Sequence, residues 1–153
     1  MTTETLLFPE FEQSITERID STILMLLTGN AGGPLGMTLN DDEKTILRML
    51  RYMRGLRNTL SIREIQQKTK FSPRSIKDIV RCLRLNFALP IGSSKSSLGG
   101  GYYIMITRED VSAWGKDLFG QVRAEVAAFH GAAGPRATAE LLGQLGLELE
   151  VWK

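Results

Sequence analysis

Three closely spaced helix starts are the feature of this sequence that most constrains its fold. Each pairs a capping side chain with a favourable residue in the first helical turn, and the pairs are Asn40 with Glu43, Ser61 with Glu64, and Ser72 with Pro73. In the first two pairs each side chain satisfies a backbone N–H at the other's position, and in the third the proline has no N–H to satisfy. Because a cap stabilises a helix by about 1 kcal/mol, we predict helices at about 41–54, 62–69 and 73–86, the last two separated by a tight turn.

Apolar residues recur at three- and four-residue steps through these three helices, as on the buried face of a packed helix. The inward-facing residues are Ile46, Leu47, Leu50 and Met53 in the first helix, Ile62 and Ile65 in the second, and Ile76, Ile79, Val80 and Leu83 in the third. A short helix, a tight turn and a longer helix, preceded by another helix, form the helix-turn-helix arrangement.

Two short extended segments follow the third helix. Pro90 disfavours helix at the residue before it, so we expect 89–91 to be extended, and the composition of 102–106 predicts a strand. The Gly- and Ser-rich residues 92–101 join them, with Lys95 as their one base. In a nucleotide-binding loop the lysine follows glycine and opens a helix, so we interpret this loop as the tip of a β-hairpin, or wing, instead.

An amphipathic helix is predicted on each side of this region. Residues 10–28 carry one apolar face, and a breaker-rich linker follows at 29–36. Residues 107–110 have the composition of a helix start, which predicts a second long helix at about 108–130. The two apolar faces consist of Ile15, Ile19, Ile23, Leu26 and Leu27, and of Val111, Trp114, Leu118, Val122, Val126 and Phe129.

Breakers at 131–135 should end the second long helix. A short helix is predicted near 137–145, and residues 147–152 alternate between apolar and charged as a strand does. We therefore expect a mainly α fold with a small β-wing (α+β) in three parts, which are an acidic N-terminal helix and linker at 1–36, a helix-turn-helix domain with a wing at 37–107, and a C-terminal helical extension with a short tail at 108–153.

Composition excludes several classes of protein. The chain is 42% hydrophobic with a net charge of only +2, which is typical of a folded domain rather than a disordered chain. Cys82 and His130 are the single cysteine and histidine, so neither an internal disulfide nor a Cys/His zinc site can form. No signal peptide or membrane-spanning run is visible. With no nucleophile–base pair or paired carboxylate at a suggestive spacing, we expect a cytoplasmic protein that is not an enzyme and needs no cofactor.

Charge is distributed very unevenly along the chain. Residues 1–43 have a net charge of −7, residues 44–84 contain twelve bases and only two acids, and residues 85–153 have a net charge of −1. A block of +10 inside a nearly neutral chain favours an anionic partner. The alternative interpretation is a solvated helix surface whose compensating acids lie elsewhere.

Residues 40–106 resemble the winged helix-turn-helix superfamily, and more narrowly the small winged-helix proteins of bacterial and phage genomes. The residues that carry the resemblance are the Leu89-Pro90-Ile91-Gly92-Ser93-Ser94 run and the Gly101-Tyr102-Tyr103-Ile104 run after the third helix. The resemblance implies binding to double-stranded DNA, with the third helix, 72–86, in the major groove and the wing, 92–101, on the backbone. The acidic N-terminal helix and the elements after the wing depart from a plain winged helix.

The bases of the third helix agree with this interpretation. They recur at steps of three and four along one stripe beside the apolar face, and they are Arg74, Lys77, Arg81 and Arg84. Arg74, Ser75 and Lys77 lie near the start of the helix, where base edges are read. We expect Arg81, Arg84, Lys68 and Lys70 to contact phosphates, and Lys95 at the wing tip to reach phosphate or a minor groove. Each of these bases could instead be a solvated surface side chain.

We therefore expect a winged-helix protein that binds double-stranded DNA in transcriptional or replication control of bacterial or phage DNA, located in the cytoplasm or on the nucleoid. The alternative is a winged helix that serves as a protein–protein interaction module without DNA binding, with the acidic N-terminal helix as its adaptor. Neither a membrane nor a small-molecule partner is expected.

A homodimer is also expected, because operators are usually read by two-fold dimers. One of the two flanking apolar faces would pair with its copy, and the face at 108–130 is the better candidate because that helix is longer. Packing of both faces onto the central domain would give a monomer instead.

Overall fold

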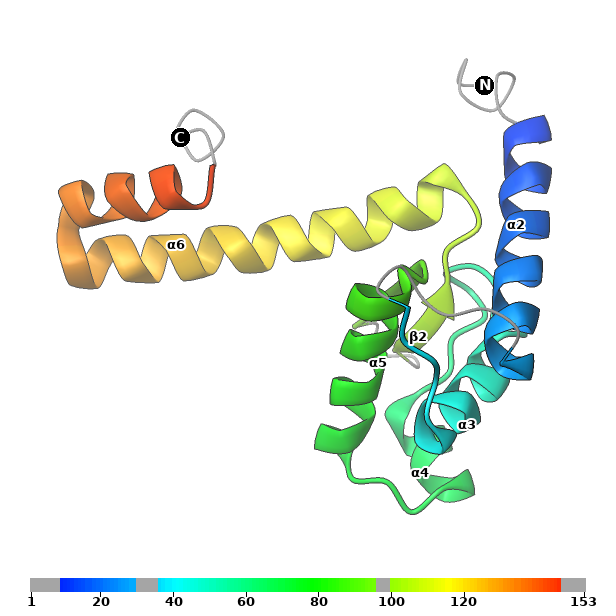
Figure 1. Ribbon diagram of the computed structural model, residues 1–153. Coiled ribbons are helices and arrows are strands. Elements are labelled where there is room, and N and C mark those ends of the chain that lie inside the picture. The colour runs from blue at the N-terminus through cyan, green and yellow to red at the C-terminus, as the bar shows by residue number, and fades with distance from the viewer. Residues whose placement is uncertain (1–8, 30–35, 96–99, 147–153) are drawn as a thin grey trace. The chain divides into compact units, whose positions relative to one another are not determined.

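The computed structural model describes residues 9–29, 36–95 and 100–146, and the chain divides into two compact units with the boundary after Val111 (Figure 1). The described residues are mostly helical with one two-stranded sheet, which confirms the expected mainly α, α+β class. In chain order the elements are α2 (Pro9–Thr28), α3 (Asp41–Leu50), α4 (Ile62–Lys68), α5 (Pro73–Phe87), β1 (Ile91–Ser94), β2 (Gly101–Ile104) and α6 (Arg108–Gln144).

Side-chain caps fix where α3, α4 and α5 begin, as predicted. At α3 the Asn40 side chain accepts a hydrogen bond from the Glu43 N–H at 2.8 Å, and the Glu43 carboxylate accepts one from the Asn40 N–H at 2.9 Å. The same reciprocal pair begins α4. At α5 the Ser72 hydroxyl accepts from the Ser75 N–H at 3.1 Å, and Pro73 follows as the first helical residue. The register of all three helices is therefore set locally.

The first of these helices is shorter than predicted. α3 ends at Leu50, whereas its apolar spacing predicted a helix to about residue 54. Beyond it the Met53 carbonyl accepts a hydrogen bond from the Ile104 N–H at 2.7 Å, and the Gly55 N–H donates to the Ile104 carbonyl at 3.0 Å. Gly55 has a φ of 83°, which glycine adopts at little cost. The chain leaves the helix in order to pair with β2, and helical periodicity carries no signal for such a pairing.

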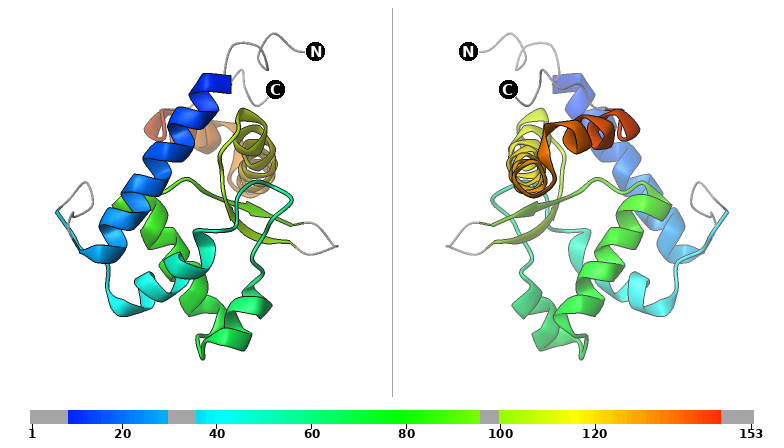
Figure 2. Two further views of the ribbon diagram at one scale, coloured as in Figure 1. Left: turned by 90° about the vertical axis from the view of Figure 1, so that its right-hand side faces the viewer. Right: turned by 90° about the vertical axis from the view of Figure 1, so that its left-hand side faces the viewer.

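β1 and β2 form an antiparallel hairpin whose register places Gly92 opposite Tyr103 (Figure 2). The first strand was predicted at 89–91 and the loop at 92–101. β1 instead begins at Ile91 and continues to Ser94, so the first three residues of the predicted loop belong to the strand. This prediction was wrong because the Tyr103 ring lies against Gly92, where a Cβ would come within 2.7 Å of the ring. Only glycine leaves room for this packing, which keeps the strands paired through Ser94.

The other edge of β2 pairs with the segment between α3 and α4. Leu60 and Tyr102 exchange two backbone hydrogen bonds, of 2.7 and 2.9 Å. Gly101 permits this approach, because a Cβ there would lie 2.4 Å from the Leu60 carbonyl oxygen. This bridge joins the hairpin to the rest of the first unit, and no local pattern in the sequence predicts it.

The N-terminal helix is part of the first unit's core. Ile19, Ile23 and Leu26 of α2 are 7%, 1% and 3% exposed, and they belong to the same buried cluster as the apolar faces of α3, α4 and α5. Asp20 on this helix also forms an ion pair with Arg54. The first compact unit extends across the expected boundary between residues 36 and 37.

In the second unit, α6 is interrupted at Gly134, which has φ 89° and ψ 172° and is followed by Pro135. The two helical parts lie side by side as an antiparallel hairpin (Figures 1 and 2), in which Leu142 is 1% exposed. The break falls inside the predicted 131–135, although the first part continues past its predicted end at about 130. The strand predicted at 147–152 lies outside the described residues.

An apolar face remains exposed on the first part of α6. Leu118, Phe119, Val122 and Phe129 are each between 37% and 42% exposed. Side chains of this size normally lie in a core or an interface when they recur on one helical face. None of the helices described is long and apolar enough to cross a membrane.

Candidate nucleic-acid interface

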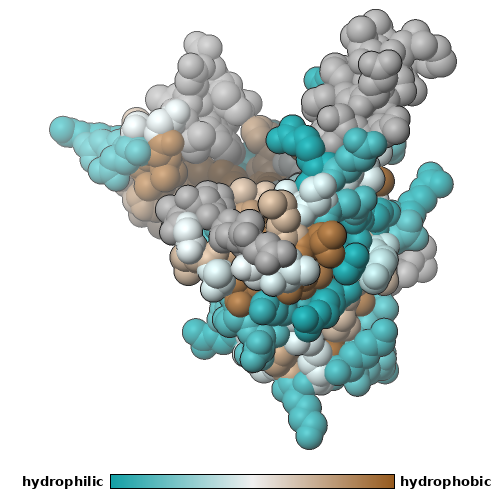
Figure 3. Space-filling model, turned by 45° about the vertical axis from the view of Figure 1, so that its right-hand side comes forward, coloured by the Kyte–Doolittle hydropathy of each residue, from teal (hydrophilic) through white to brown (hydrophobic). Residues whose placement is uncertain are grey.

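The solvent-facing side of α5 presents a stripe of bases. Arg74, Lys77 and Arg81 are exposed and follow one another at steps of three and four residues, so they share one side of the helix. On the opposite side Ile76 and Leu83 are fully buried, which fixes the orientation of the helix. Figure 3 shows hydrophilic side chains projecting at the end of the unit where α4 and α5 meet. The core thus holds the basic stripe toward solvent.

Ser75, predicted to lie near base edges, is exposed and takes part in the cap of α5. Its N–H donates to the Ser72 hydroxyl, and its own hydroxyl oxygen accepts a hydrogen bond from Ser72 at 3.0 Å. The Ser75 hydroxyl proton is left to donate elsewhere. The cap therefore fixes the position of this side chain at the start of the stripe.

Arg84 was expected to contact phosphate with the other bases, but it does not lie with the exposed ones. Its side chain is half-buried, its Nε donates to the Ile91 carbonyl at 2.7 Å, and its guanidinium carbon lies 5.7 Å from the centre of the Tyr102 ring. Burial lowers the pKa of Arg84 and raises the pKa of Tyr102, and the guanidinium remains charged at neutral pH. Arg84 joins α5 to β1 instead of facing solvent, a role that helical spacing alone could not distinguish.

The remaining predicted bases lie in two places. Lys68 ends α4 and Lys70 lies in the turn that leads into α5, and both are exposed beside the start of the basic stripe. Lys95 is exposed immediately after β1, at the outer end of the hairpin. Lys68 and Lys70 thus lie at and just after the end of α4, close in sequence to the start of α5, and Lys95 follows β1 of the projecting hairpin (Figure 2).

Two residues that the sequence analysis did not single out lie on the same stripe. Asp78 is exposed between Arg74 and Arg81, and Leu85 is 67% exposed one turn beyond Arg81. The steps from 74 to 78, 81 and 85 are four, three and four, so helical spacing could have identified both. The surface presented by α5 is therefore basic but not uniformly so.

Two arginines of the segment after α3 make contacts within the first unit. Arg54 pairs with Asp20 and donates from Nε to the Arg51 carbonyl at 2.7 Å. The Arg51 guanidinium lies 4.9 Å from the centre of the Tyr52 ring. Some bases of the +10 block therefore make intramolecular contacts. The sequence alone does not show which bases do so and which remain free to meet a partner.

A buried carboxylate joins α3 to α5 behind the basic stripe. Glu43 is 5% exposed, and its Oε2 accepts a hydrogen bond from the Cys82 thiol at 2.8 Å. The Asn86 side chain in turn donates to the Cys82 sulfur at 3.2 Å. Burial, reinforced by the bond to Glu43, raises the pKa of the Cys82 thiol, which therefore stays protonated at neutral pH.

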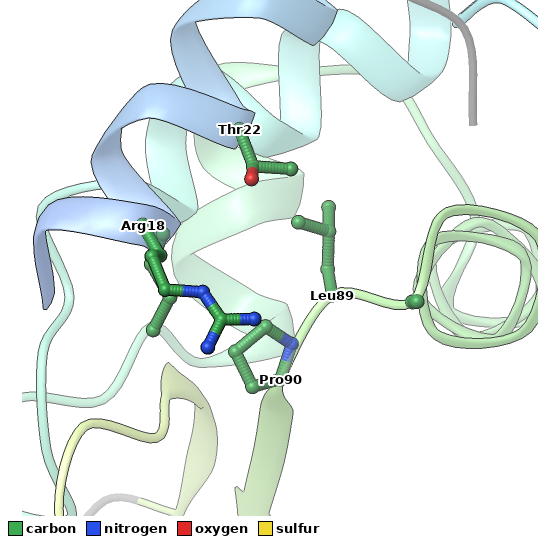
Figure 4. Close-up of a pocket in the computed structure, with 6 residues that line it drawn as sticks. Arg18, Thr22, Leu89 and Pro90 are labelled. Carbon is green, nitrogen blue, oxygen red and sulfur yellow. The ribbon is translucent and has the colours of Figure 1, made fainter. Parts of the chain in front are cut away.

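A pocket of about 300 Å³ lies between α2 and the segment after α5, lined by Arg18, Ile19, Thr22, Ala88, Leu89 and Pro90. Figure 4 shows Arg18 and Thr22 projecting from α2 and Leu89 and Pro90 on the segment after α5, with the Arg18 guanidinium pointing toward the Pro90 ring. The pocket contains none of the residues predicted for DNA contact. Within the described part of the chain, no group of three or more His, Cys, Asp or Glu side chains is placed to hold a metal ion.

The arrangement on α5 suits an extended anion with repeated charges better than a small ligand. Its exposed bases are spread over two turns of one helix, and Lys68 and Lys70 extend the basic surface past the start of that helix. Comparison of the chain with models of protein families, with curated proteins and with solved structures gave no match.

Proposed function

We propose that this chain is a winged-helix protein that binds double-stranded DNA, with α5 in the major groove and the β1–β2 hairpin as a wing on the backbone. The observation that carries the proposal is the exposed stripe of Arg74, Lys77 and Arg81 on a helix whose other side is fully buried. The major groove is about 12 Å wide and accepts an α-helix. Arg74 and Lys77, near the helix start, would meet base edges, and Arg81 would meet phosphate.

The link between α5 and β1 supports the wing's part in this proposal. The Arg84 Nε donates to the Ile91 carbonyl, and the Leu60–Tyr102 bridge holds the other strand. Lys95 is thereby carried on an element attached directly to α5. A helix in the groove and a base on the adjoining backbone would then engage one face of the duplex together.

We also propose that two copies assemble through the exposed face of α6. The apolar face of α2 is used within the core of the first unit, so α6 carries the flanking face that remains exposed. Charged residues of both signs accompany it, including Lys116, Asp117, Arg123 and Glu125. Two antiparallel copies can therefore place opposite charges together, and a two-fold dimer would present two α5 helices to spaced half-sites.

The process proposed is transcriptional or replication control of bacterial or phage DNA, in the cytoplasm or on the nucleoid. It rests on the resemblance of residues 40–106 to small winged-helix proteins of those genomes and on the +10 block. The competing function is a protein–protein interaction module without DNA binding.

A binding titration of the full chain against mixed-sequence duplex DNA at several salt concentrations tests the proposal. With Lys68, Lys70, Arg81 and Lys95 as phosphate contacts, log K should fall with log salt at a slope of about −4 per bound protomer. The double variant Lys68→Gln, Lys70→Gln should reduce the steepness by about 2. Absence of retardation of any duplex at low salt would favour the interaction module.

A further inference from the structure

The basic block from 44 to 84 contains two acids, and the structure explains only one of them. Glu64 accepts hydrogen bonds from Ser61 and completes the cap of α4. Asp78 is exposed on α5 between Arg74 and Arg81, at the i,i+4 and i,i+3 spacings that favour ion pairs. No salt bridge or hydrogen bond joins the Asp78 side chain to either arginine or to any other residue that the structure describes.

The position of this carboxylate would be unfavourable if α5 contacted only the phosphate backbone of DNA. A negative charge near phosphates is repelled, and Asp78 lies in the second turn of α5, beyond the first turn in which the helix dipole stabilises an acid. A carboxylate on a DNA-facing helix becomes favourable where it accepts a hydrogen bond from a base edge. In the major groove Asp and Glu accept from the N4 amino group of cytosine.

We propose that Asp78 determines specificity by accepting a hydrogen bond from cytosine N4 in the major groove. The inference rests on the proposed DNA binding by α5. Asp78 lies one turn beyond Arg74 on the same side of the helix, so the two side chains address neighbouring positions of one site. The negative charge also disfavours guanine and thymine at this position, because they present only acceptors and, for thymine, a methyl group there.

The test is selection of preferred duplexes from a randomised library by wild type, Asp78→Asn and Asp78→Ala, followed by affinity measurements on the selected site and on random duplex. Wild type should prefer cytosine at one position by about tenfold. Asp78→Asn should shift that preference to adenine, which an asparagine amide reads in two hydrogen bonds. Asp78→Ala should lose the preference while binding random duplex more tightly.

Asp42→Asn is the matched control, because it removes an exposed carboxylate from the first turn of α3 and not from the α5 stripe. It should leave the base preferences unchanged. If Asp78→Ala tightens binding to all duplexes and the cytosine preference persists, Asp78 is only a repulsive surface charge and this inference is overturned while DNA binding stands. If wild type retards no duplex, the proposed function fails and this inference fails with it. Circular dichroism of the variants verifies that each is folded.

Discussion

The thiol of Cys82 on α5 donates a hydrogen bond to the Glu43 carboxylate on α3, and the second oxygen of that carboxylate accepts from the Asn40 N–H. One buried side chain therefore caps its own helix and joins it to the helix that carries the basic stripe. Because Glu43 is 5% exposed, loss of either hydrogen bond leaves a carboxylate oxygen poorly compensated.

Cys82→Ala should lower the free energy of unfolding by about 1–2 kcal/mol, because it removes the donor to Glu43 Oε2. Cys82→Ser keeps a donor of similar size and should lose less. Urea unfolding followed by circular dichroism measures both. Equal losses for alanine and serine would show that the bond to Glu43 contributes nothing to stability.

Alkylation of Cys82 should be slow at neutral pH and should accelerate only above the pH at which an ordinary thiol titrates. Burial and the bond to Glu43 raise the pKa of the thiol, so the thiolate fraction is small at pH 7. The same shift contributes stability that is fully present below the thiol's unfolded pKa and is lost as pH rises through its folded value. The measurement is the rate of iodoacetamide labelling against pH, with urea-unfolded protein as the reference. A folded-state profile that coincides with the unfolded one would contradict the raised pKa.

Arg84→Ala should destabilise the first unit by about 2 kcal/mol, since it removes a charged donor to the Ile91 carbonyl and the packing of its stem. Arg81→Ala, one turn earlier on the exposed stripe, should change stability by less than about 0.5 kcal/mol. Thermal or urea unfolding distinguishes the two. Similar effects from both substitutions would mean that the contact of Arg84 with β1 is not stabilising.

Arg74→Ala and Lys77→Ala should weaken binding to a preferred duplex more than to random DNA, whereas Arg81→Ala should weaken both alike. A base contact contributes about 1–3 kcal/mol of discrimination and a phosphate contact contributes none. Competition titrations of selected against random duplex supply the ratio. If all three variants lose affinity uniformly, α5 does not read sequence.

Light scattering at micromolar concentration should give twice the chain mass of 17.0 kDa. Leu118→Glu places a charge in the exposed apolar face of α6 and should halve that mass. A wild-type protein that remains at 17.0 kDa would contradict the dimer. So would a Leu118→Glu variant that keeps the wild-type mass.

Local signals predicted the helices well, and tertiary contacts account for what they missed. The starts of α3, α4 and α5 follow from caps between near neighbours in the chain, so the sequence contains them. The end of α3 and the extent of β1 depend on contacts with β2, many residues away, for which periodicity carries no signal.

The same distinction applies to the candidate interface. Helical spacing placed Arg74, Lys77 and Arg81 on one stripe, and the structure shows all three exposed. Spacing also placed Arg84 with them, but its side chain turns toward Ile91, a contact that lies outside the helix. Helical spacing thus identifies which side of a helix carries the bases. Whether a base at the edge of that side is exposed depends on the element that packs next to it.

The burial of Ile19 and Ile23 against the other helices limits how this protein can evolve. The acidic helix α2 and the basic residues of α5 belong to one folding unit, so neither can be lost or exchanged as a separate module. A fragment beginning at Asn40 would expose the surface that α2 covers, at a cost of about 1.5–3 kcal/mol for each large apolar side chain involved, a sizeable share of a domain's total stability. The smallest autonomous piece is therefore expected to begin with α2.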